Sequence, residues 1–331
     1  MMQCSNCGAA VVVDDKFCEE CGASLTSLAC EKCGAGIEAI DAEGYCSQCG
    51  FRRVSVESER LEITINSHLA GVSDRGLRHR RNEDYLALQQ VNGTQAYILV
   101  VCDGVSSSDQ PDLAAQTAAS SACQSVATAY SGNKPESAIK SAFAAAFASV
   151  CNIPYKTSAN LDPPSTTIVT AIVEEGTATI GWLGDSRAYW ISANGSQQLT
   201  TDDSWLSEVV AGGKITAEEA SKSPHAHAIT RWLGADAVED AIPSIVNFTI
   251  PGSGYLLLCS DGLWNYAPEA SHLANLVQKS SGKDAITISR SLVEFARNCG
   301  GHDNITVAVF IFFEKQKTKS IKNELKNKFE H

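Results

Sequence analysis

Four aspartates, each inside its own short motif, constrain the fold of this 331-residue chain more than any other feature. They are Asp84, Asp103, Asp261 and Asp303. Three of them adjoin an apolar run typical of a buried strand: Asp103 follows residues 98–102, Asp261 follows 255–259, and Asp303 precedes 305–310. A carboxylate at the tip of a buried strand costs free energy unless a cation lies beside it. Because several carboxylates can hold two hard cations such as Mg²⁺ or Mn²⁺, the pattern predicts metal-assisted hydrolysis.

The whole-chain composition narrows the class of protein. A chain of 331 residues accommodates one sizeable domain and a small one. Its net charge of −12 argues against nucleic acid and acidic membranes as partners. No apolar run approaches the roughly 20 residues that span a bilayer, and the N-terminus lacks the basic and apolar regions of a secretory signal. We therefore expect a soluble, cytoplasmic protein.

Eight of the 13 cysteines lie within the first 50 residues, as four Cys-x-x-Cys pairs each followed by glycine. The pairs are Cys4 and Cys7, Cys18 and Cys21, Cys30 and Cys33, and Cys46 and Cys49. Each pair folds two thiolates onto one ion, and two pairs complete a tetrahedral zinc site. Redox dithiols are the alternative, but they need a βαβ context that 50 residues with four such pairs cannot supply. The segment 1–50 resembles tandem zinc ribbons and predicts two structural Zn²⁺ ions.

The charge of this cysteine-rich segment bears on its partners. Residues 1–50 carry two lysines against eight acidic residues. Such a module is a poor binder of nucleic acid. We expect it to contact protein or to act as a structural cap.

The rest of the chain divides into a linker, a large domain and a tail. Residues 51–60 predict a linker, 61–313 one domain, and the lysine-rich residues 314–331 a basic tail that is a frayed helix or disordered. Strands are predicted at 63–68, 85–89, 96–102, 167–173, 179–183, 188–191, 255–259 and 305–312. Helices are predicted at 112–130, 136–150, 204–210, 269–279 and 284–298. Since the strands are mostly neighbours in sequence, the order favours an α+β fold of antiparallel sheets with helices outside.

Seven motifs in register resemble those of the PPM family, the type 2C metal-dependent serine/threonine protein phosphatases. They are Ser73-Asp74-Arg75-Gly76 with Asn82-Glu83-Asp84; Val101-Cys102-Asp103-Gly104; Ser165-Thr166-Thr167; Gly184-Asp185-Ser186-Arg187; Leu199-Thr200-Thr201-Asp202; Ser260-Asp261-Gly262; and Asp303-Asn304. The resemblance implies an αββα sandwich of two mostly antiparallel sheets flanked by helices, with a flap subdomain around 204–240 and metals between the sheet edges.

The resemblance also implies ligands for two Mn²⁺ or Mg²⁺ ions. Asp103 would bridge them. The carbonyl of Gly104 would contact the second ion, which Glu83 and Asp84 would hold directly or through water.

Asp261 and Asp303 would hold the first ion. Asp185 occupies the position where some bacterial relatives bind a third, weaker ion together with the Asp261 position. A simpler interpretation of Asp185 is that it caps a turn between two strands. Within this scheme a hydroxide bridging two cations attacks the phosphoryl group in line, and no covalent enzyme intermediate is needed.

Two departures from the family pattern concern the phosphate. The family's phosphate-binding arginine lies five residues before the Asp84 position, where this chain has His79. Either His79 contacts phosphate, or a flanking arginine does, with Arg78 the first candidate; an exposed basic loop without such contact is the alternative. No histidine follows Gly104, so the general acid of some eukaryotic relatives is absent, and water or a weak acid would protonate the leaving oxygen.

We therefore expect a bacterial-type, cytoplasmic hydrolase that removes phosphate from phosphoserine and phosphothreonine in proteins, with Asp103, Asp261, Asp303, Arg78 and His79 as its catalytic residues. The resemblance implies a phosphorylated protein as substrate and a Ser/Thr kinase as counterpart. The altered sequence around His79 motivates the alternative, a degenerate domain that binds phosphoproteins without turnover. The ribbons suggest targeting to a narrow set of phosphoproteins.

Overall fold

The computed structural model describes the larger domain almost completely and the N-terminal segment in part. Described are residues 2–3, 10–11, 30, 32–36, 39, 46–50, 60–130, 134–156, 161–213, 215–237 and 242–313. The chain divides into two compact units, Met1–Glu59 and Arg60–His331. In the first unit, strands β1 (Met2–Gln3) and β2 (Ala10–Val11) pair antiparallel.

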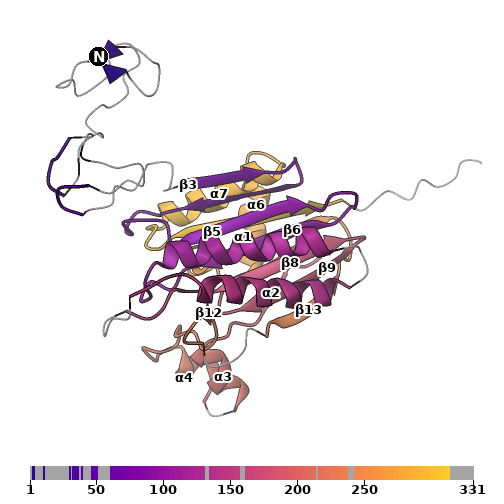
Figure 1. Cartoon of the computed structure of the whole chain (residues 1–331). Coiled ribbons are helices and arrows are strands. Elements are labelled where there is room, and N and C mark those ends of the chain that lie inside the picture. Colours follow the sequence, from indigo (N-terminus) through magenta and orange to yellow (C-terminus); the bar gives the residue numbers. More distant parts are fainter. Residues whose placement is uncertain are drawn as a thin grey trace, which may run out of the picture. The chain divides into compact units, whose positions relative to one another are not determined.

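Two antiparallel sheets form the centre of the second unit (Figure 1). The first sheet has the order β11-β10-β14-β15-β4-β3, with β3 Arg60–Thr64, β4 Leu69–Asp74, β10 Arg187–Ile191, β11 Gln197–Gln198, β14 Gly254–Cys259 and β15 Ile305–Phe312. The second sheet has the order β13-β9-β8-β6-β5, with β5 Asp84–Gln90, β6 Tyr97–Asp103, β8 Ile168–Glu174, β9 Thr177–Leu183 and β13 Ser244–Thr249.

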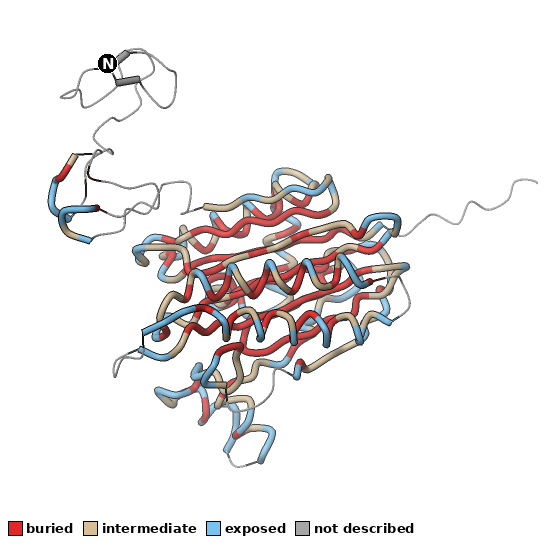
Figure 2. The backbone as a smooth tube through the Cα atoms, in the orientation of Figure 1, coloured by how far each residue is buried: buried red, intermediate tan, exposed pale blue. Residues whose placement is uncertain are grey.

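Apolar side chains from both sheets meet in the space between them. Leu69, Leu256 and Phe310 of the first sheet join Leu86 and Leu99 of the second in one buried cluster. Most of the strand residues are buried, whereas the helices alternate between buried and exposed positions (Figure 2). Burial on both faces explains why the central strands have continuous apolar sequences.

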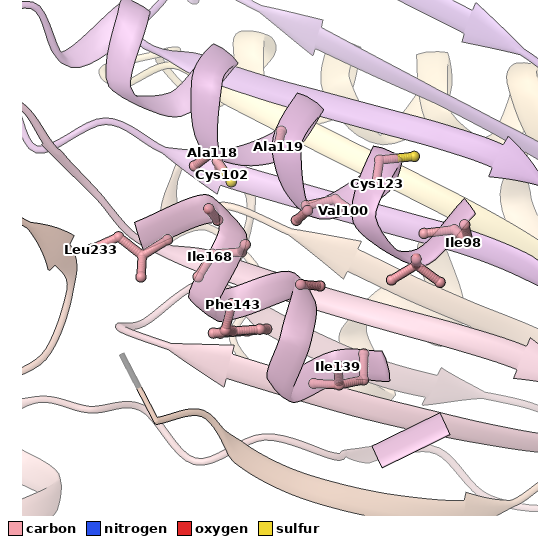
Figure 3. Close-up of a cluster of buried hydrophobic side chains, with 14 of the residues drawn as sticks. Ile98, Val100, Cys102, Ala118, Ala119, Cys123, Ile139, Phe143, Ile168 and Leu233 are labelled. Carbon is pink, nitrogen blue, oxygen red and sulfur yellow. The ribbon is translucent and has the colours of Figure 1, made fainter. Parts of the chain in front are cut away.

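Helices cover the outer face of each sheet and complete four layers. Helices α1 (Pro111–Ala129) and α2 (Pro135–Cys151) pack on the second sheet, and α6 (Ala270–Lys279) and α7 (Ala285–Asn298) pack on the first. Figure 3 shows Ala118 of α1 and Phe143 of α2 in the cluster that joins these helices to β6 and β8. A side chain at Gly181 of β9 would place its Cβ 2.4 Å from Ile139 of α2, so glycine permits this close packing. The expected αββα sandwich is confirmed.

A small subdomain interrupts the sandwich between β11 and β13. It contains α3 (Trp205–Ala211), α4 (Ala217–Ala220) and β12 (Leu233–Gly234), which pairs with β7 (Ser165–Thr166). Ser204 caps α3, and Thr216 and Glu219 form a capping box on α4. The segment matches the region in which the sequence predicts a flap.

The predicted elements differ from the structure in several places. The strand predicted at 63–68 is wrong, because residues 65–68 form the turn of the β3–β4 hairpin. Asn66 makes that turn by accepting hydrogen bonds from the backbone N–H groups of His68 and Leu69. Strand β13 and the short helices α4 and α5 (Asp261–Trp264) are additions to the prediction. The five predicted helices lie within one residue of α1, α2, α3, α6 and α7.

Some predictions fall outside the described residues. These are most of the linker at 51–60, the tail at 314–331 and the first two cysteine pairs. Within the described part of the chain, no helix is long and apolar enough to cross a membrane.

Candidate metal centre

Asp84 and Asp103 face each other across neighbouring strands of the second sheet. Asp84 opens β5, Asp103 closes β6, and the antiparallel register pairs the two residues directly. Opposed residues in such a ladder have Cα atoms about 4.5–5.5 Å apart. The sheet register therefore brings together two carboxylates that are 19 residues apart in sequence.

Asp261 and Asp303 reach the same place from the first sheet. Asp261 follows β14 as the first residue of α5, Asp303 precedes β15, and these two strands are neighbours. The Ser260 hydroxyl donates a 2.7 Å hydrogen bond to Oδ2 of Asp84 and thus joins the two sheets at the acidic cluster. The cluster consequently lies where strand ends of both sheets meet.

The carboxylates of this cluster disfavour one another's negative charge. Burial, together with the charges of Asp303 and Asp261, raises the pKa of Asp84 to about 8. Burial and the charge of Asp303 raise the pKa of Asp261 to about 7, and burial with the charge of Asp84 raises that of Asp103 well above its usual range. A divalent cation among these groups would offset both the desolvation and the mutual repulsion.

Two observations fit a cation at this cluster. Oδ1 of Asp84 is buried and has no hydrogen-bond partner among the described residues, although a buried carboxylate oxygen normally has one. As whole residues, Asp103, Asp261 and Asp303 are only partly covered by the protein. An all-oxygen donor set of this kind suits Mg²⁺ or Mn²⁺.

Close backbone packing explains the glycine after two of the aspartates. A Cβ at Gly104 would lie 2.4 Å from the carbonyl oxygen of Pro111 and 2.7 Å from that of Glu83. A Cβ at Gly262 would lie 1.9 Å from the carbonyl oxygen of Asn304. Any other residue would have to push the chain apart at the cluster, so both Asp-Gly pairs are steric requirements of the site.

Asn304 ties three segments of the site together. Its Oδ1 accepts a 2.8 Å hydrogen bond from the backbone N–H of Glu83, and its Nδ2 donates to the carbonyl oxygens of Arg75 and Arg81 at 2.8 and 3.0 Å. The residue that follows Asp303 therefore fixes the chain on both sides of residues 76–80.

Glu83 is buried beside groups that stabilise its negative charge. Arg81 Nε donates to Glu83 Oε1 at 2.9 Å, and the Ser106 hydroxyl donates to Oε2 at 2.6 Å. Arg81 also pairs with Asp112 at 3.4 Å. Ser106 lies two residues beyond Gly104, in the segment where the sequence shows no histidine.

His79 lies directly on one of the candidate ligands. Its Nε2 is 3.2 Å from Oδ1 of Asp303, and Arg75 donates a hydrogen bond to its carbonyl oxygen. Arg78, the other candidate for phosphate contact, is exposed. The structure therefore brings His79 to the acidic cluster through a side-chain contact and leaves Arg78 at the surface.

Asp185 is buried in the turn between β9 and β10. Burial, together with the charge of Asp261, raises the pKa of Asp185 to about 8. Trp264 Nε1 donates to its carbonyl oxygen at 2.9 Å. The Arg187 guanidinium lies 3.7 Å from the centre of the Trp264 ring and makes two hydrogen bonds to Asp202, at 2.6 and 2.8 Å. Asp202 is thus a structural partner of Arg187.

A second candidate metal site lies in the N-terminal unit. The Sγ atoms of Cys30, Cys33, Cys46 and Cys49 all lie within 4.8 Å of one another. The backbone N–H of Gly34 donates to the carbonyl of Cys30, and that of Gly50 donates to the carbonyl of Cys46. Both glycines have positive φ, near 73° and 70°.

These glycines close the turns that place each thiol pair, and such a set of four thiols suits Zn²⁺. Cys4, Cys7, Cys18 and Cys21 lie outside the described residues. Cys102 and Cys259, by contrast, are fully buried in strands and are core residues.

Several polar residues near the acidic cluster hold its segments together by hydrogen bonds that the sequence did not predict. Ser260 donates to Asp84 and accepts from the backbone N–H of Thr306 at 3.0 Å. The hydroxyl of Thr306 donates to Ser73 Oγ at 2.7 Å, and Ser73 accepts from Asn82 at 2.8 Å. The sequence feature that could have indicated this role is the Ser260 hydroxyl, which directly follows an apolar strand.

Comparisons with known proteins agree with this geometry. A family model described as protein phosphatase 2C matches residues 75–295, and one described as a double zinc ribbon matches residues 4–50. The serine/threonine phosphatase stp of Listeria welshimeri is 34% identical over 148 residues. That region covers 45% of this chain and 57% of the Listeria protein, so the chain spans little more than half the length of this curated relative.

Solved structures are similar over most of the chain. The phosphatase Stp1 from Staphylococcus aureus superposes with a TM-score of 0.66 at 25% identity, over 77% of this chain and 98% of that one. The catalytic domain of the phosphatase PstP, in complex with 2 manganese ions, superposes with a TM-score of 0.57 at 25% identity, over 73% of this chain and 97% of that one.

Proposed function

The chain belongs to the protein phosphatase 2C family, and we propose that it hydrolyses phosphoserine and phosphothreonine in proteins by direct attack of water. The observation that carries the proposal is the acidic cluster. One buried oxygen of Asp84 has no hydrogen-bond partner among the described residues, and bound cations would offset the burial and repulsion that raise the carboxyl pKa values. The manganese in the similar PstP structure supports the same assignment.

The proposed ligands divide between the two sheets. Asp103 and the Gly104 carbonyl lie at the end of β6, whereas Asp261 and Asp303 come from the ends of β14 and β15. Bound there, two Mn²⁺ or Mg²⁺ ions would supply a water nucleophile near neutral pH and offset charge on the phosphoryl oxygens.

Glu83 and Asp84 complete the proposed set for the second ion. The hydrogen bonds of Glu83 to Arg81 and Ser106 hold its carboxylate in one orientation, as does the Ser260 bond for Asp84. Asp185, near Asp261, is the group we assign to a third, weaker cation.

His79 and Arg81 are the basic residues best placed to orient the phosphate. Each already contacts a carboxylate of the proposed ligand set, His79 on Asp303 and Arg81 on Glu83. A phosphoryl group held at the cations would therefore meet one or both. The Ser106 hydroxyl is engaged in a hydrogen bond to Glu83, so we assign protonation of the leaving oxygen to solvent.

The cysteine cluster supports a separate, structural proposal. We assign one Zn²⁺ to Cys30, Cys33, Cys46 and Cys49, and a second to the first two cysteine pairs, which the double zinc ribbon match includes. Such thiolate sites require a reducing compartment, which supports a cytoplasmic enzyme. The acidic ribbons favour contact with a protein, such as a phosphorylated target or the kinase that supplies it.

The decisive test is hydrolysis of a phosphothreonine peptide by the full chain, with Mn²⁺ titrated. We expect turnover that requires the metal and that falls about a thousandfold or more in Asp103→Asn. Asp284→Asn is the matched control, because Asp284 caps α7 and asparagine caps a helix equally well. Binding of the peptide without turnover by the Mn²⁺-loaded wild type would instead establish a phosphoprotein-binding module.

A further inference from the structure

A basic loop, residues 75–81, lies between β4 and β5 at the edge of the acidic cluster. It contains four arginines and His79 and no acidic residue, in a chain whose net charge is −12. The loop is therefore a local concentration of positive charge on an otherwise acidic protein.

Two arginines of the basic loop are unpaired. Arg78 and Arg80 are exposed, and neither makes a hydrogen bond or an ion pair with any residue of the described part of the chain. Other arginines of the domain behave differently: Arg60, Arg187, Arg231, Arg290 and Arg297 each pair with a carboxylate. The two free guanidiniums are thus available to a partner.

The basic loop is fixed in place by its backbone. Asn304 holds the carbonyls of Arg75 and Arg81 at its two ends, and the N–H of Leu77 donates to the carbonyl of Gly301 at 2.7 Å. A Cβ at Gly76 would lie 2.1 Å from the carbonyl oxygen of Asp303, which shows how tightly the loop packs on the acidic cluster. The backbone that carries the Arg78 and Arg80 side chains is therefore fixed in position.

Arg78 and Arg80 lie next to the proposed active site. They flank His79 in sequence, and the His79 imidazole contacts the proposed ligand Asp303. An extended peptide advances about 3.3 Å per residue, so side chains two or three positions from the phosphoresidue lie roughly 7–10 Å from it. Arginine side chains on the neighbouring loop reach over such distances, and their guanidiniums bind carboxylate or phosphate oxygens in pairs.

We propose that Arg78 and Arg80 select phosphoprotein segments that carry acidic or further phosphorylated residues within about three positions of the scissile phosphate. The proposal rests on the phosphatase activity proposed above and names the substrate class of that site. Charge complementarity between unpaired guanidiniums and an anionic segment is the physical basis.

The test uses three phosphothreonine peptides that differ only in flanking residues, which are glutamate, glutamine or lysine. kcat/KM is measured for the full wild-type chain, for Arg78→Gln/Arg80→Gln and for Arg78→Lys/Arg80→Lys. The control Lys279→Gln/Arg290→Gln also removes two exposed positive charges, but on α6 and α7. Thermal unfolding of every variant checks that it is folded.

We expect the wild type to prefer the glutamate peptide over the glutamine peptide by about three- to tenfold at low salt, as two exposed charge pairs permit. The preference should fall below about twofold in the double glutamine variant, persist in part in the lysine variant, and remain in the control. It should also shrink as salt is added.

Three results would overturn the proposal. One is equal kcat/KM for the three peptides in the wild type, and another is a preference that survives in Arg78→Gln/Arg80→Gln. The third is a uniform loss on all three peptides, which would assign these arginines to the phosphate itself. Should the wild type hydrolyse no peptide, the proposed function fails, and the relative affinities of the same peptides by fluorescence anisotropy still decide the selectivity of the loop.

Discussion

The acidic cluster and the four-cysteine cluster are both candidate metal sites, but they are built in opposite ways. The carboxylates come from strand ends in two sheets, and Asp84 and Asp303 are 219 residues apart in sequence. The four thiols Cys30, Cys33, Cys46 and Cys49 lie within 20 residues and depend on two glycine turns. In the first case the fold positions the ligands, and in the second the metal must position the chain.

The surroundings of the two clusters agree with this difference. The domain that carries the acidic cluster also contains three large buried apolar clusters, which stabilise the sandwich. Around the thiols the described core consists of Cys30, Ala35, Ala39 and Cys46, so half of its members are themselves proposed ligands. A core of that size cannot offset the loss of conformational entropy on folding. The binding of metal must therefore supply the remaining free energy that stabilises the fold.

Removal of metal should separate the two regions most clearly. We expect a strong chelator to abolish phosphatase activity, by about a thousandfold or more, and to leave the sandwich at 60–313 folded. The same treatment should unfold the ribbons, because thiolate zinc sites carry the folding free energy of such modules. Hydrogen exchange of the full chain, with and without chelator, measures both regions in one experiment. If the sandwich strands lost as much protection as residues 30–50, both regions would depend on metal for folding, and the proposed difference between them would be wrong.

Substitution of one thiol should affect one region alone. In Cys30→Ser the zinc content should fall from two ions to one per chain, since a thiolate of the tetrahedral set is lost. The Mn²⁺-dependent kcat of the phosphatase domain should stay within about twofold of wild type, because the acidic cluster lies in a separately folded unit. Metal analysis and peptide hydrolysis test the two statements. Cys123→Ser, a buried thiol of the sandwich, is the control that should leave zinc content unchanged.

Removal of the Ser260 hydroxyl should weaken the acidic site without destroying it. Ser260→Ala leaves Oδ2 of Asp84 and the N–H of Thr306 without their partner. We expect the Mn²⁺ concentration for half-maximal activity to rise about 10- to 100-fold, and the free energy of unfolding to fall by about 1–3 kcal/mol.

Ser280→Ala is the matched control for that substitution. The Ser280 hydroxyl is also buried but makes no hydrogen bond with a described residue. Its removal should leave metal activation unchanged. Equal effects of the two alanine substitutions on metal activation would show that the Ser260 bond has no part in holding the ligand.

The smallest expected effect is on the pH dependence of stability in metal-free protein. The pKa of Asp84 is raised to about 8 and that of Asp261 to about 7, whereas an aspartate in the unfolded chain titrates near 3.9. Between these values the folded state binds more protons than the unfolded state. The contribution of these two carboxyl groups to stability is therefore fully present below about pH 4 and is lost as the pH rises toward 8, by on the order of a few kcal/mol.

Thermal unfolding in chelator between pH 5 and 8.5 measures this loss. Added Mn²⁺ should remove most of it, and Asp84→Asn should reduce its slope. A melting temperature that rises with pH over this range in chelator would contradict the repulsion between the carboxylates of the cluster.

The sequence predicts the two sheets and their helices because the central strands are buried on both faces. Continuous runs such as 305–312 have few alternatives to a buried strand, and β15 matches that range. Strand β13, half exposed at the edge of its sheet, lacks such a run and escapes prediction. The β3–β4 hairpin is not predicted because the turn at Asn66 interrupts the apolar sequence. Gly71 in β4 also disfavours a strand when the sequence is taken alone.

Gly71 is in fact a packing requirement, since a Cβ there would lie 2.7 Å from Leu86 of the facing sheet. The supporting bonds of the site escape prediction for a similar reason. Asn304 reaches Glu83, and Ser260 reaches Asp84, only after the two sheets have packed. Ligand types can be predicted from short motifs, whereas partners that meet through tertiary packing cannot.

A crystal structure of the full chain grown with Mn²⁺, with anomalous data at the manganese edge, tests the central claim most directly. We expect two strong anomalous peaks between the strand ends, both within bonding distance of Asp103. One should also contact Asp261 and Asp303, and the other the Gly104 carbonyl with Glu83 or Asp84. Manganese bound elsewhere on the protein, with no anomalous density at the acidic cluster, would contradict the account.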